Sequence, residues 1–234
     1  IMAEGSEELP IQFSSSNPNI YWDGFDYEGT NIISEEPSKF DHCLFQYGLA
    51  SGGSEYNSGG IFAVRSYDQI EIKNSTFRHN KAIIQSSTYV TCGGAIGLWN
   101  ASPMIQSCIF HDNEALDYGG AILSYAVSDP IISNCLFYDN VSERGGALAF
   151  YEYGNGIVIN NTIADNSALY GGALYFYDHG SPEIINNIIY DNEASISGSE
   201  VYFSTLGSYP GFYYNNIEEG LEGFGGNVQE IDYL

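Results

Sequence analysis

The stretch GGAILSYAVSDPIISNCLFYDNVSERGGAL, residues 119–148, contains one complete repeat of this protein and the start of the next. A Gly-Gly-Ala-aliphatic motif opens it at Gly119 and returns at Gly145, 26 residues later. The same motif also begins at Gly93 and Gly171, again at intervals of 26 residues. A strict interval of this length indicates a repeat architecture, in which each repeat buries its apolar face against its neighbours.

A second motif, an aromatic or aliphatic residue three positions before an Asn, accompanies the first. Its copies are Phe77 to Asn80, Phe110 to Asn113, Phe137 to Asn140, Ile163 to Asn166 and Ile189 to Asn192. The Asn residues follow one another at intervals of 33, 27, 26 and 26 residues, and a looser copy spans Phe45 to Gly48. The longer first interval predicts an insertion, which we place in a loop around Gln85 to Thr91.

Short apolar runs separated by Gly, Asn, Asp and Ser fill each repeat, and no segment sustains a helical apolar stripe over three turns. The sequence therefore predicts an all-β fold, a parallel β-solenoid with coils of about 26 residues that contain two or three short strands each. Leucine-rich repeats have a similar length, but their Leu-x-x-Leu-x-Leu frame is missing here.

Side chains alternate across a strand, so the aligned repeats predict which columns of residues point into the solenoid. Three columns are expected inside: Ile96, Ile122, Leu148 and Leu174; Leu98, Ser124, Phe150 and Phe176; and Cys43, Ser75, Cys108, Cys135, Asn161 and Asn187. The Asn column of the second motif is expected at a turn, where Asn tolerates a left-handed backbone and its amide bonds neighbouring groups. The Gly-Gly pairs are expected to form another tight corner.

The size and composition of the chain suit one buried core, since 44% of its 234 residues are hydrophobic and 15% are charged. We expect a single domain over residues 1–234, with a final coil or cap over 205–234. Because the pattern is already under way at Ile1, we also expect the chain to be a piece of a longer protein. No run of 18 or more apolar residues occurs, so no direct membrane span is expected.

The charge of the chain is strongly one-sided: six Lys and Arg against thirty Asp and Glu give a net charge of −24. Nucleic-acid binding depends on the neutralisation of phosphates, so nucleic acid is excluded as a partner. Most carboxylates have no cation within the chain and must be solvated, hydrogen-bonded or neutralised from outside. The four cysteines, Cys43, Cys92, Cys108 and Cys135, show no Cys-x-x-Cys spacing and therefore no zinc or redox motif.

An aromatic column provides the candidate ligand-binding residues. Trp99, Tyr125, Tyr151 and Tyr177 recur every 26 residues on the strand face opposite to the inward columns. Their ring faces, about 4.8 Å apart, are expected to face solvent. Sugar rings pack on such faces, so the column is a candidate site for a glycan or a protein partner. The alternative is a ladder that only stiffens the exterior, or one covered by a loop or another domain.

An acidic column provides the candidate metal ligands. Asp112, Asp139, Asp165 and Asp191 each stand directly before the Asn of the second motif. Carboxylates about 4.8 Å apart repel each other. A calcium ion with oxygen ligands at about 2.4 Å is able to bridge two of them. Calcium is the only cofactor that the sequence suggests. The alternative is that each Asp is a turn residue that bonds its local backbone.

No catalytic residue is assigned. A glycosidase needs two carboxylates about 6.5–9.5 Å apart, and a regular ladder of acids offers many such pairs. His42, His79, His111 and His179 lie in separate repeats with no spacing typical of a metal site or a catalytic triad. An enzyme nevertheless stays an alternative, because a fold does not determine a function.

The motif pair Phe-x-x-Asn and Gly-Gly-Ala-Ile/Leu resembles the repeats of chlamydial polymorphic outer membrane proteins. More broadly, it is similar to bacterial secreted right-handed parallel β-helix proteins, which are related in fold to pectate lyases. The resemblance covers residues 1–217 and is strongest over 72–200. It implies a right-handed parallel β-helix, export from a bacterial cell, and an adhesin-like role outside the cell or on its surface. It implies no reaction.

Three functions therefore stay open from the sequence. The favoured one is a non-catalytic, adhesin-like or structural module that presents a rigid acidic and aromatic surface to a glycan or a surface protein. The second is a polysaccharide lyase or glycoside hydrolase. The third is a purely structural subunit or spacer of a larger surface assembly.

Overall fold

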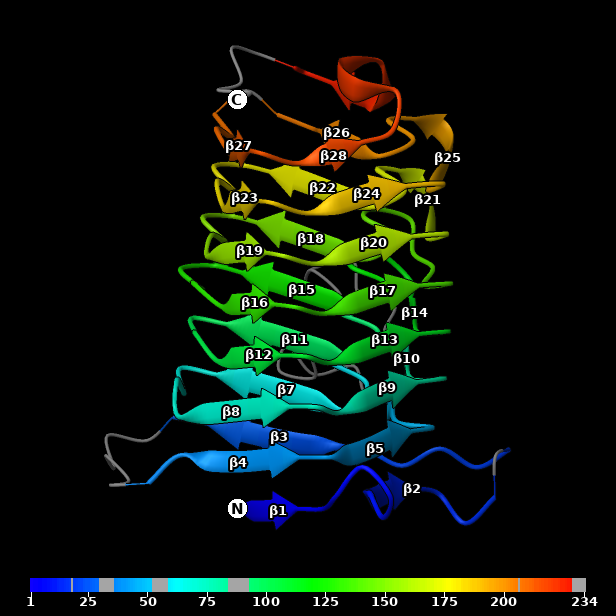
Figure 1. Cartoon of the computed structure of the whole chain (residues 1–234), viewed down its shortest axis with the longest axis vertical. Coiled ribbons are helices and arrows are strands. Elements are labelled where there is room, and N and C mark those ends of the chain that lie inside the picture. The colour runs from blue at the N-terminus through cyan, green and yellow to red at the C-terminus, as the bar shows by residue number, and fades with distance from the viewer. Residues whose placement is uncertain (18, 30–35, 52–58, 84–92, 206, 229–234) are drawn as a thin grey trace.

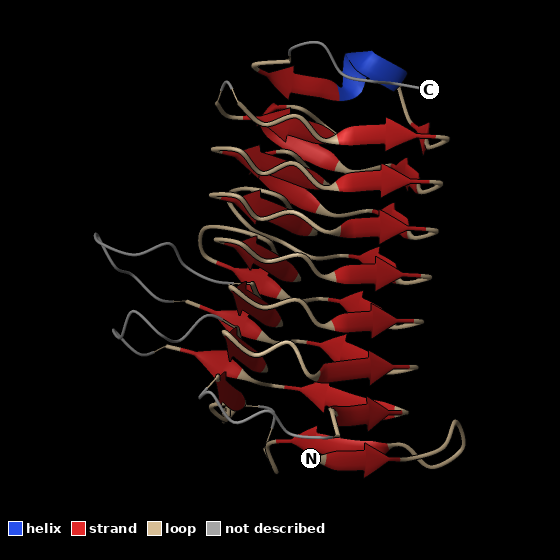
Figure 2. Ribbon diagram, turned by 90° about the vertical axis from the view of Figure 1, so that its left-hand side faces the viewer, coloured by secondary structure: helices blue, strands red, loops and turns tan. Residues whose placement is uncertain are grey.

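The chain forms a parallel β-solenoid in which the coils stack along one axis, from the N-terminal coil to a C-terminal 3-10 helix (Figures 1 and 2). The structure, a computed structural model, describes all residues except 18, 30–35, 52–58, 84–92, 206 and 229–234. The predicted loop around Gln85 to Thr91, and Cys92, lie outside the described residues. The predicted all-β, parallel architecture is confirmed, because every paired strand runs parallel to its neighbour in the next coil.

Three sheets of eight strands run the length of the solenoid. Sheet I consists of β1 (Met2–Glu4), β4 (Ser38–Asp41), β8 (Ile70–Lys73), β12 (Met104–Gln106), β16 (Ile131–Ser133), β19 (Ile157–Ile159), β23 (Glu183–Ile185) and β27 (Gly211–Tyr213). Sheet II consists of β2 (Ile11–Ser14), β5 (Cys43–Gln46), β9 (Thr76–Arg78), β13 (Ile109–His111), β17 (Leu136–Tyr138), β20 (Thr162–Ala164), β24 (Ile188–Tyr190) and β28 (Asn216–Ile217). Sheet III consists of β3 (Phe25–Glu28), β7 (Phe62–Arg65), β11 (Ile96–Trp99), β15 (Ile122–Tyr125), β18 (Leu148–Tyr151), β22 (Leu174–Tyr177), β26 (Val201–Phe203) and β29 (Phe224–Gly226).

A narrower set of pairings, which we call the short strip, lies between sheets II and III in each coil, on the right of Figure 1. It consists of β6 (Leu49–Ala50), β10 (Lys81–Ala82) and β14 (Glu114–Ala115) at one end, and β21 (Ser167–Tyr170) and β25 (Glu193–Ser197) at the other. Val141 joins the two ends, since it forms single bridges to Glu114 and to Ser167. The strip is therefore continuous from Leu49 to Ser197.

The chain turns between strands through single residues with a left-handed backbone. In the coil that begins with β16, Asn134 makes the turn from sheet I to sheet II with a φ of 54°, and Asp139 makes the turn from sheet II to the strip with the same φ. Asn and Asp are the non-glycine residues that adopt this conformation most readily. These turns explain why Asn and Asp recur at fixed positions in the repeat.

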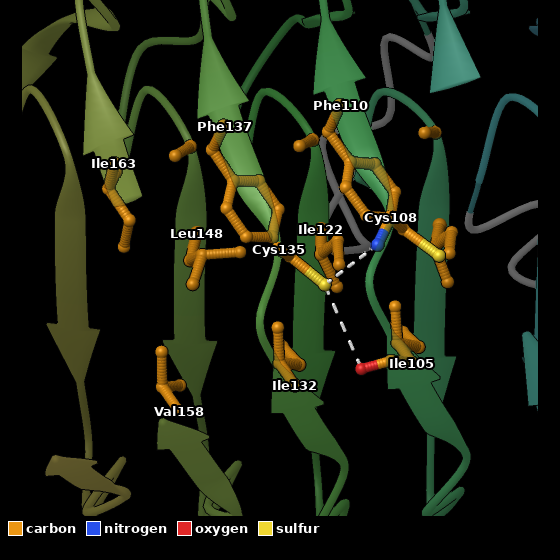
Figure 3. Packing of buried hydrophobic residues seen from close by; sticks show 14 of the residues in the cluster. Ile105, Cys108, Phe110, Ile122, Ile132, Cys135, Phe137, Leu148, Val158 and Ile163 are labelled. Carbon is orange, nitrogen blue, oxygen red and sulfur yellow. Dashed lines mark hydrogen bonds between the residues drawn. The ribbon is translucent and has the colours of Figure 1, made fainter. Parts of the chain in front are cut away.

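All three predicted inward columns are buried, which confirms the predicted alternation along the strands. They pack against a stack of phenylalanine rings, of which Phe110 and Phe137 are seen in Figure 3. Neighbouring rings along the stack Phe13, Phe45, Phe77, Phe110 and Phe137 are nearly parallel, with centroids 5.0, 4.7, 4.6 and 4.9 Å apart. A fully buried Phe side chain contributes about 1.5–3 kcal/mol by leaving water. The ring stack therefore stabilises every coil junction that it crosses.

The Asn residues of the second motif form a buried ladder along the inside of the solenoid. From Asn113 onward, the Oδ1 atom of each accepts hydrogen bonds from both the backbone N–H and the Nδ2 of the Asn one coil before it, whereas the Oδ1 of Asn80 accepts from the backbone N–H of Gly48. For Asn140 these two bonds come from Asn113 and measure 3.1 and 2.9 Å. The members of the ladder are Asn80, Asn113, Asn140, Asn166 and Asn192.

The expectation of a left-handed backbone at these Asn residues is wrong. The left-handed residue is the one before each Asn, namely His79, Asp112, Asp139, Asp165 and Asp191. The physical reason is that the ladder requires the amide to point inward. The turn itself is made one position earlier, where the side chain points to the outside.

The column that contains the cysteines is a second hydrogen-bonded ladder, located at the corner between sheets I and II. The backbone N–H of Cys108 donates to Cys135 Sγ at 3.4 Å (Figure 3). The backbone N–H of Cys135 donates to Asn161 Oδ1 at 2.8 Å. The ladder continues through Asn187 to Asn215, which the sequence analysis did not include. Each of five side chains in this column thus accepts a hydrogen bond from a backbone N–H of the preceding coil. These are Ser75, Cys135, Asn161, Asn187 and Asn215.

Glycine is required at the corner before sheet III for two different reasons. Gly119, Gly145 and Gly171 have φ values of 62°, 70° and 67°, so the first glycine of the pair turns the chain as expected. At the second position the backbones of adjacent coils approach too closely for a side chain. A Cβ on Gly146 would lie 2.1 Å from the carbonyl oxygen of Gly172.

The C-terminal end of the Asn ladder is closed by a carboxylate. Glu200 occupies the position that Ala173 holds one coil earlier, and it is 1% exposed. The 3-10 helix η1 (Gly220–Gly223) covers it, with the Glu200 N–H donating to the carbonyl oxygen of Gly223 at 3.0 Å. No helix in the described part of the chain is long and apolar enough to cross a membrane.

Candidate functional site

The predicted aromatic column forms one continuous row on the outer face of sheet III. Trp99, Tyr125, Tyr151 and Tyr177 are the last residues of β11, β15, β18 and β22, and the strand register places each directly beside the next. Each side chain is half-buried rather than fully exposed to solvent. The sequence therefore predicted the row correctly, but it overestimated how much of each ring faces solvent.

The rings of this row contact one another instead of presenting free faces throughout. Tyr151 and Tyr177 are stacked, with centroids 4.4 Å apart and planes 13° from parallel. At the other end, Trp99 and Tyr125 are nearly perpendicular, with centroids 4.7 Å apart and an interplanar angle of 86°. At the C-terminal end of the row, Tyr151 and Tyr177 therefore cover one face of each other. At the N-terminal end, the perpendicular arrangement of Trp99 and Tyr125 interrupts the stack.

A second aromatic layer, not identified from the sequence, surrounds the row. Leu123, Ala149 and Tyr175 occupy outward positions of sheet III and are nevertheless buried. They are covered by half-buried tyrosines from the row and from neighbouring positions. These are Tyr118, Tyr125, Tyr151, Tyr170, Tyr177 and Tyr202. We call the surface made by these tyrosines, Tyr175 and Trp99 the tyrosine face.

Arg144 is the cation of the tyrosine face and the only Lys or Arg in the sequence after Lys81. Its guanidinium lies over the Tyr118 ring, 5.1 Å from the centroid, in a cation–π contact. The same group lies 3.0 Å from a Glu143 oxygen and 3.7 Å from an Asp117 oxygen. Its charge is therefore already balanced within the protein, which leaves the face with no net attraction for anions.

Burial controls the ionisation of the tyrosine hydroxyls. It raises the pKa of Tyr125 and of Tyr175 to about 12, and it raises the pKa of Tyr151 further. At neutral pH these hydroxyls are protonated, so the face offers neutral groups that both donate and accept hydrogen bonds.

The family of the chain follows from its sequence and agrees with this geometry. The family model for the right-handed β-helix region matches residues 12–228. The chain belongs to the right-handed β-helix family. No curated protein and no solved structure shows significant similarity to it. The family match shows that the β-helix is right-handed.

The predicted acidic column lies along the turn between sheet II and the short strip of the β-helix. Asp112, Asp139, Asp165 and Asp191 are all exposed, and each has a φ between 54° and 56°. Within the described residues, no group of three or more His, Cys, Asp or Glu side chains is arranged to hold a metal ion. The left-handed backbone gives these Asp residues a structural role, and calcium binding stays a prediction.

The histidines of the β-helix do not come together as one site. His42, His111 and His179 each contact the Asp beside them in the sequence, at 2.9, 2.6 and 2.8 Å. His79 stacks on Tyr47 with ring centroids 5.6 Å apart, and burial lowers its pKa. The His–Asp contacts are local, whereas His79 contacts residues of both adjacent coils, Tyr47 and His111, the latter with ring centroids 6.0 Å apart.

The described cysteines are interior residues. Cys43, Cys108 and Cys135 are free and buried. Burial raises the pKa of Cys43 to about 11 and that of Cys108 well above its ordinary value. Thiolates are the reactive form of cysteine, so Cys43 and Cys108 belong to the core rather than to a site. The hydrogen bond with Cys108 lowers the pKa of Cys135, which is buried beside it.

Proposed function

We propose that this β-helix is a non-catalytic binding module, located outside the cell or on its surface, that presents the tyrosine face to a neutral glycan. The observation that carries the proposal is the tyrosine face itself. Seven tyrosines and one tryptophan gather on the outside of a sheet whose interior is already filled. The resemblance of the repeats to those of bacterial surface proteins supports the location.

Rigid aromatic side chains favour binding because little conformational freedom is lost when a ligand arrives. The strands of sheet III fix the spacing of the row, and the contact between Tyr151 and Tyr177 fixes the ring orientation. Sugar C–H groups pack on the ring surface near Trp99 and Tyr125, where the stack is interrupted. The tyrosine hydroxyls then supply hydrogen bonds to the sugar hydroxyls.

The charge distribution indicates the class of glycan. The chain carries a net charge of −24, and the one guanidinium of the face already contacts Glu143 and Asp117. A polyanionic glycan would be repelled by such a surface. The geometry therefore favours neutral sugars over uronates or sulphated chains.

The test is retention of the purified chain on immobilised cellulose, chitin, xylan and starch, with polygalacturonate as the anionic comparison. The double variant Trp99→Ala/Tyr125→Ala removes the perpendicular pair on which the sugar is proposed to pack. The matched control is Tyr190→Ala/Tyr214→Ala, which removes two exposed tyrosines from sheet II and from the corner beside it. Circular dichroism melts confirm that both variants are folded.

We expect retention of the wild type on at least one neutral polysaccharide, a loss of about tenfold or more in the first variant, and no change in the control. Absence of retention on every neutral polysaccharide would overturn the glycan proposal. Equal behaviour of the two variants would show that the tyrosine face is not the binding surface. Release of sugar into the supernatant would contradict a non-catalytic role.

A further inference from the structure

A trough on the outside of the short strip forms a second surface, separate from the tyrosine face. It consists of two adjoining hollows, of about 380 and 530 Å3, which share Val141. The first is lined by Tyr21, Tyr47, His79, Lys81, Asp112, Asn113, Glu114, Asp139 and Val141. The second extends from Val141 past Leu169 to Glu193 and Ser199. The trough therefore runs parallel to the axis of the β-helix over several coils.

The strip determines the order of the side chains along the trough. Lys81, Glu114, Val141, Ser167 and Glu193 follow one another in register, one per coil. Asp112 and Asp139 lie along one side of the trough, on turn residues whose φ is 54°. Strand pairing thus fixes the positions of Glu114 and Glu193. The left-handed turns fix the positions of Asp112 and Asp139.

The N-terminal part of the trough already holds an ammonium group. Lys81 Nζ lies 2.6 Å from a Glu114 oxygen, and this hydrogen bond raises the pKa of Lys81. Burial lowers the pKa of His79, so its imidazole adds no positive charge at neutral pH. The ion pair shows the geometry in which this surface accepts a lysine side chain.

The C-terminal part has a carboxylate, that of Glu193, but no cation. The only Lys or Arg after Lys81 is Arg144, and its guanidinium lies with Glu143 and Asp117. Glu193, and Asp139 in the first hollow, therefore form no ion pair with a cation in the part of the chain that the structure describes. Among the described residues, Lys81 is the only Lys or Arg that lines the trough. A basic ligand would supply a positive charge to the carboxylates that Lys81 does not contact.

The middle of the trough is apolar. Val141 is 45% exposed and Leu169 is 38% exposed, and Ala168 lies between them on the strip. An occupant with charges alone would leave these side chains in contact with water. The surface instead fits a segment with an apolar residue between two basic ones.

We propose that the trough binds an extended, lysine- or arginine-rich peptide segment of a partner protein, laid parallel to the axis of the β-helix. Coils lie about 4.8 Å apart, so the three steps from Glu114 to Glu193 span about 14 Å. An extended chain rises about 3.4 Å per residue, so two basic residues four positions apart match this distance. The residue midway between them points the same way and meets Val141.

The experiment uses a synthetic peptide with free ends blocked, Gly-Lys-Ser-Val-Ser-Lys-Gly, and measures its affinity for the whole chain by titration at low and physiological salt. A peptide of the same composition with adjacent lysines, Gly-Lys-Lys-Ser-Val-Ser-Gly, tests the spacing. The variant Glu114→Gln/Glu193→Gln removes the two charges of the trough that the spacing places beneath the lysines. The variant Asp129→Asn/Glu183→Gln removes two charges from another hollow, beside sheet I, and serves as the matched control.

We expect the spaced peptide to bind about five- to tenfold more weakly to the trough variant than to the wild type, in line with two exposed ion pairs. The control variant should change the affinity less than twofold. The adjacent-lysine peptide should bind more weakly than the spaced one. Equal losses in the two variants would attribute binding to the general acidity of the chain and overturn the proposal. No binding of the spaced peptide, or equal binding of both peptides, would also overturn it.

Discussion

Asn192 donates both its backbone N–H and its side-chain Nδ2 to the carboxylate of Glu200, at 3.3 and 2.7 Å. In the four preceding coils, those of Asn80, Asn113, Asn140 and Asn166, the acceptor at this point is the Oδ1 of the next Asn. An amide both accepts and donates, whereas an ionised carboxylate only accepts. The ladder therefore has a direction, and Glu200 is suited to its last position.

The first prediction concerns the pH dependence of stability through Glu200. Burial raises the pKa of this carboxyl to about 7, opposed by the hydrogen bonds from Asn192 and assisted by the charges of Glu218 and Glu219. The pKa is higher in the folded than in the unfolded state. The stabilisation that results is complete below about pH 4.5 and is lost as the pH rises through 7.

Glu200→Gln removes this titration, because the amide stays neutral. A shift of this size corresponds to about 3 kcal/mol. Between about pH 5 and 8.5, the free energy of unfolding of the wild type should therefore decrease more than that of the variant, by up to about 3 kcal/mol. Urea unfolding at the two pH values measures the difference. Glu193→Gln, which alters an exposed acid, should follow the wild type. Identical pH dependence of wild type and Glu200→Gln would show that Glu200 does not titrate in this range.

The second prediction concerns the interior of the Asn ladder. Asn140→Ala removes the Oδ1 that accepts two hydrogen bonds from Asn113, and it also removes the Nδ2 that donates to Asn166. Each buried donor left unpaired costs about 1–3 kcal/mol, so we expect a loss of about 3–5 kcal/mol. Urea unfolding measures it, with the exposed Asn216→Ala as the control. Losses below about 1 kcal/mol in both variants would contradict a stabilising ladder.

The regular part of the fold was predictable because the repeat aligns its own residues. The two inward columns of sheet III, the cysteine column and the aromatic row all follow from an interval of 26 residues and from alternation along a strand. Glu200 stands where the other repeats have Ala, so the alignment of repeats gave no indication that it contacts Asn192. Its burial depends on η1, which is not a repeat.

The tyrosine face was only partly predictable, since its second layer depends on contacts between columns. Tyr118, Arg144 and Tyr170 do recur at intervals of 26 residues, directly before the Gly-Gly pairs. That spacing was a usable signal. The side chains extend across neighbouring coils, however, so that Tyr118 contacts Tyr151 and Tyr175, with centroids 4.9 and 5.7 Å away. Alternation along one strand cannot predict such contacts.

The third prediction separates interior from exterior aromatic residues. Phe137 is fully buried and its ring stacks on Phe110 at 4.9 Å. Phe137→Ala should therefore reduce the free energy of unfolding by about 3–5 kcal/mol, through lost burial and the cavity that remains. Tyr190 is 40% exposed on the outer face of sheet II, and Tyr190→Ala should cost far less. Equal costs, measured by urea unfolding, would contradict the inward and outward assignment of sheet II.

The last prediction tests the close approach of adjacent coils at the second glycine of the repeat. A Cβ on Gly146 would meet three backbone atoms: the carbonyl oxygen of Gly172 at 2.1 Å, and the N and O atoms of Ser167 at 2.8 and 2.9 Å. None of these atoms belongs to a flexible side chain, so the coils themselves would have to separate. Separation would stretch the hydrogen bonds between the coils and the Asn ladder beside them. We therefore expect Gly146→Ala to destabilise the protein by about 3 kcal/mol or more.

Gly220→Ala provides the matched control for Gly146→Ala. Gly220 has a φ of 56°, but no atom lies within 4 Å of the position of its Cβ. Its substitution should cost only the strain of a left-handed alanine, about 1–2 kcal/mol. Thermal and urea unfolding of the two variants separate the effect of contact from the effect of backbone conformation. A larger loss of stability in Gly220→Ala than in Gly146→Ala would contradict this explanation. It would show that close packing of adjacent coils does not account for the glycine at position 146.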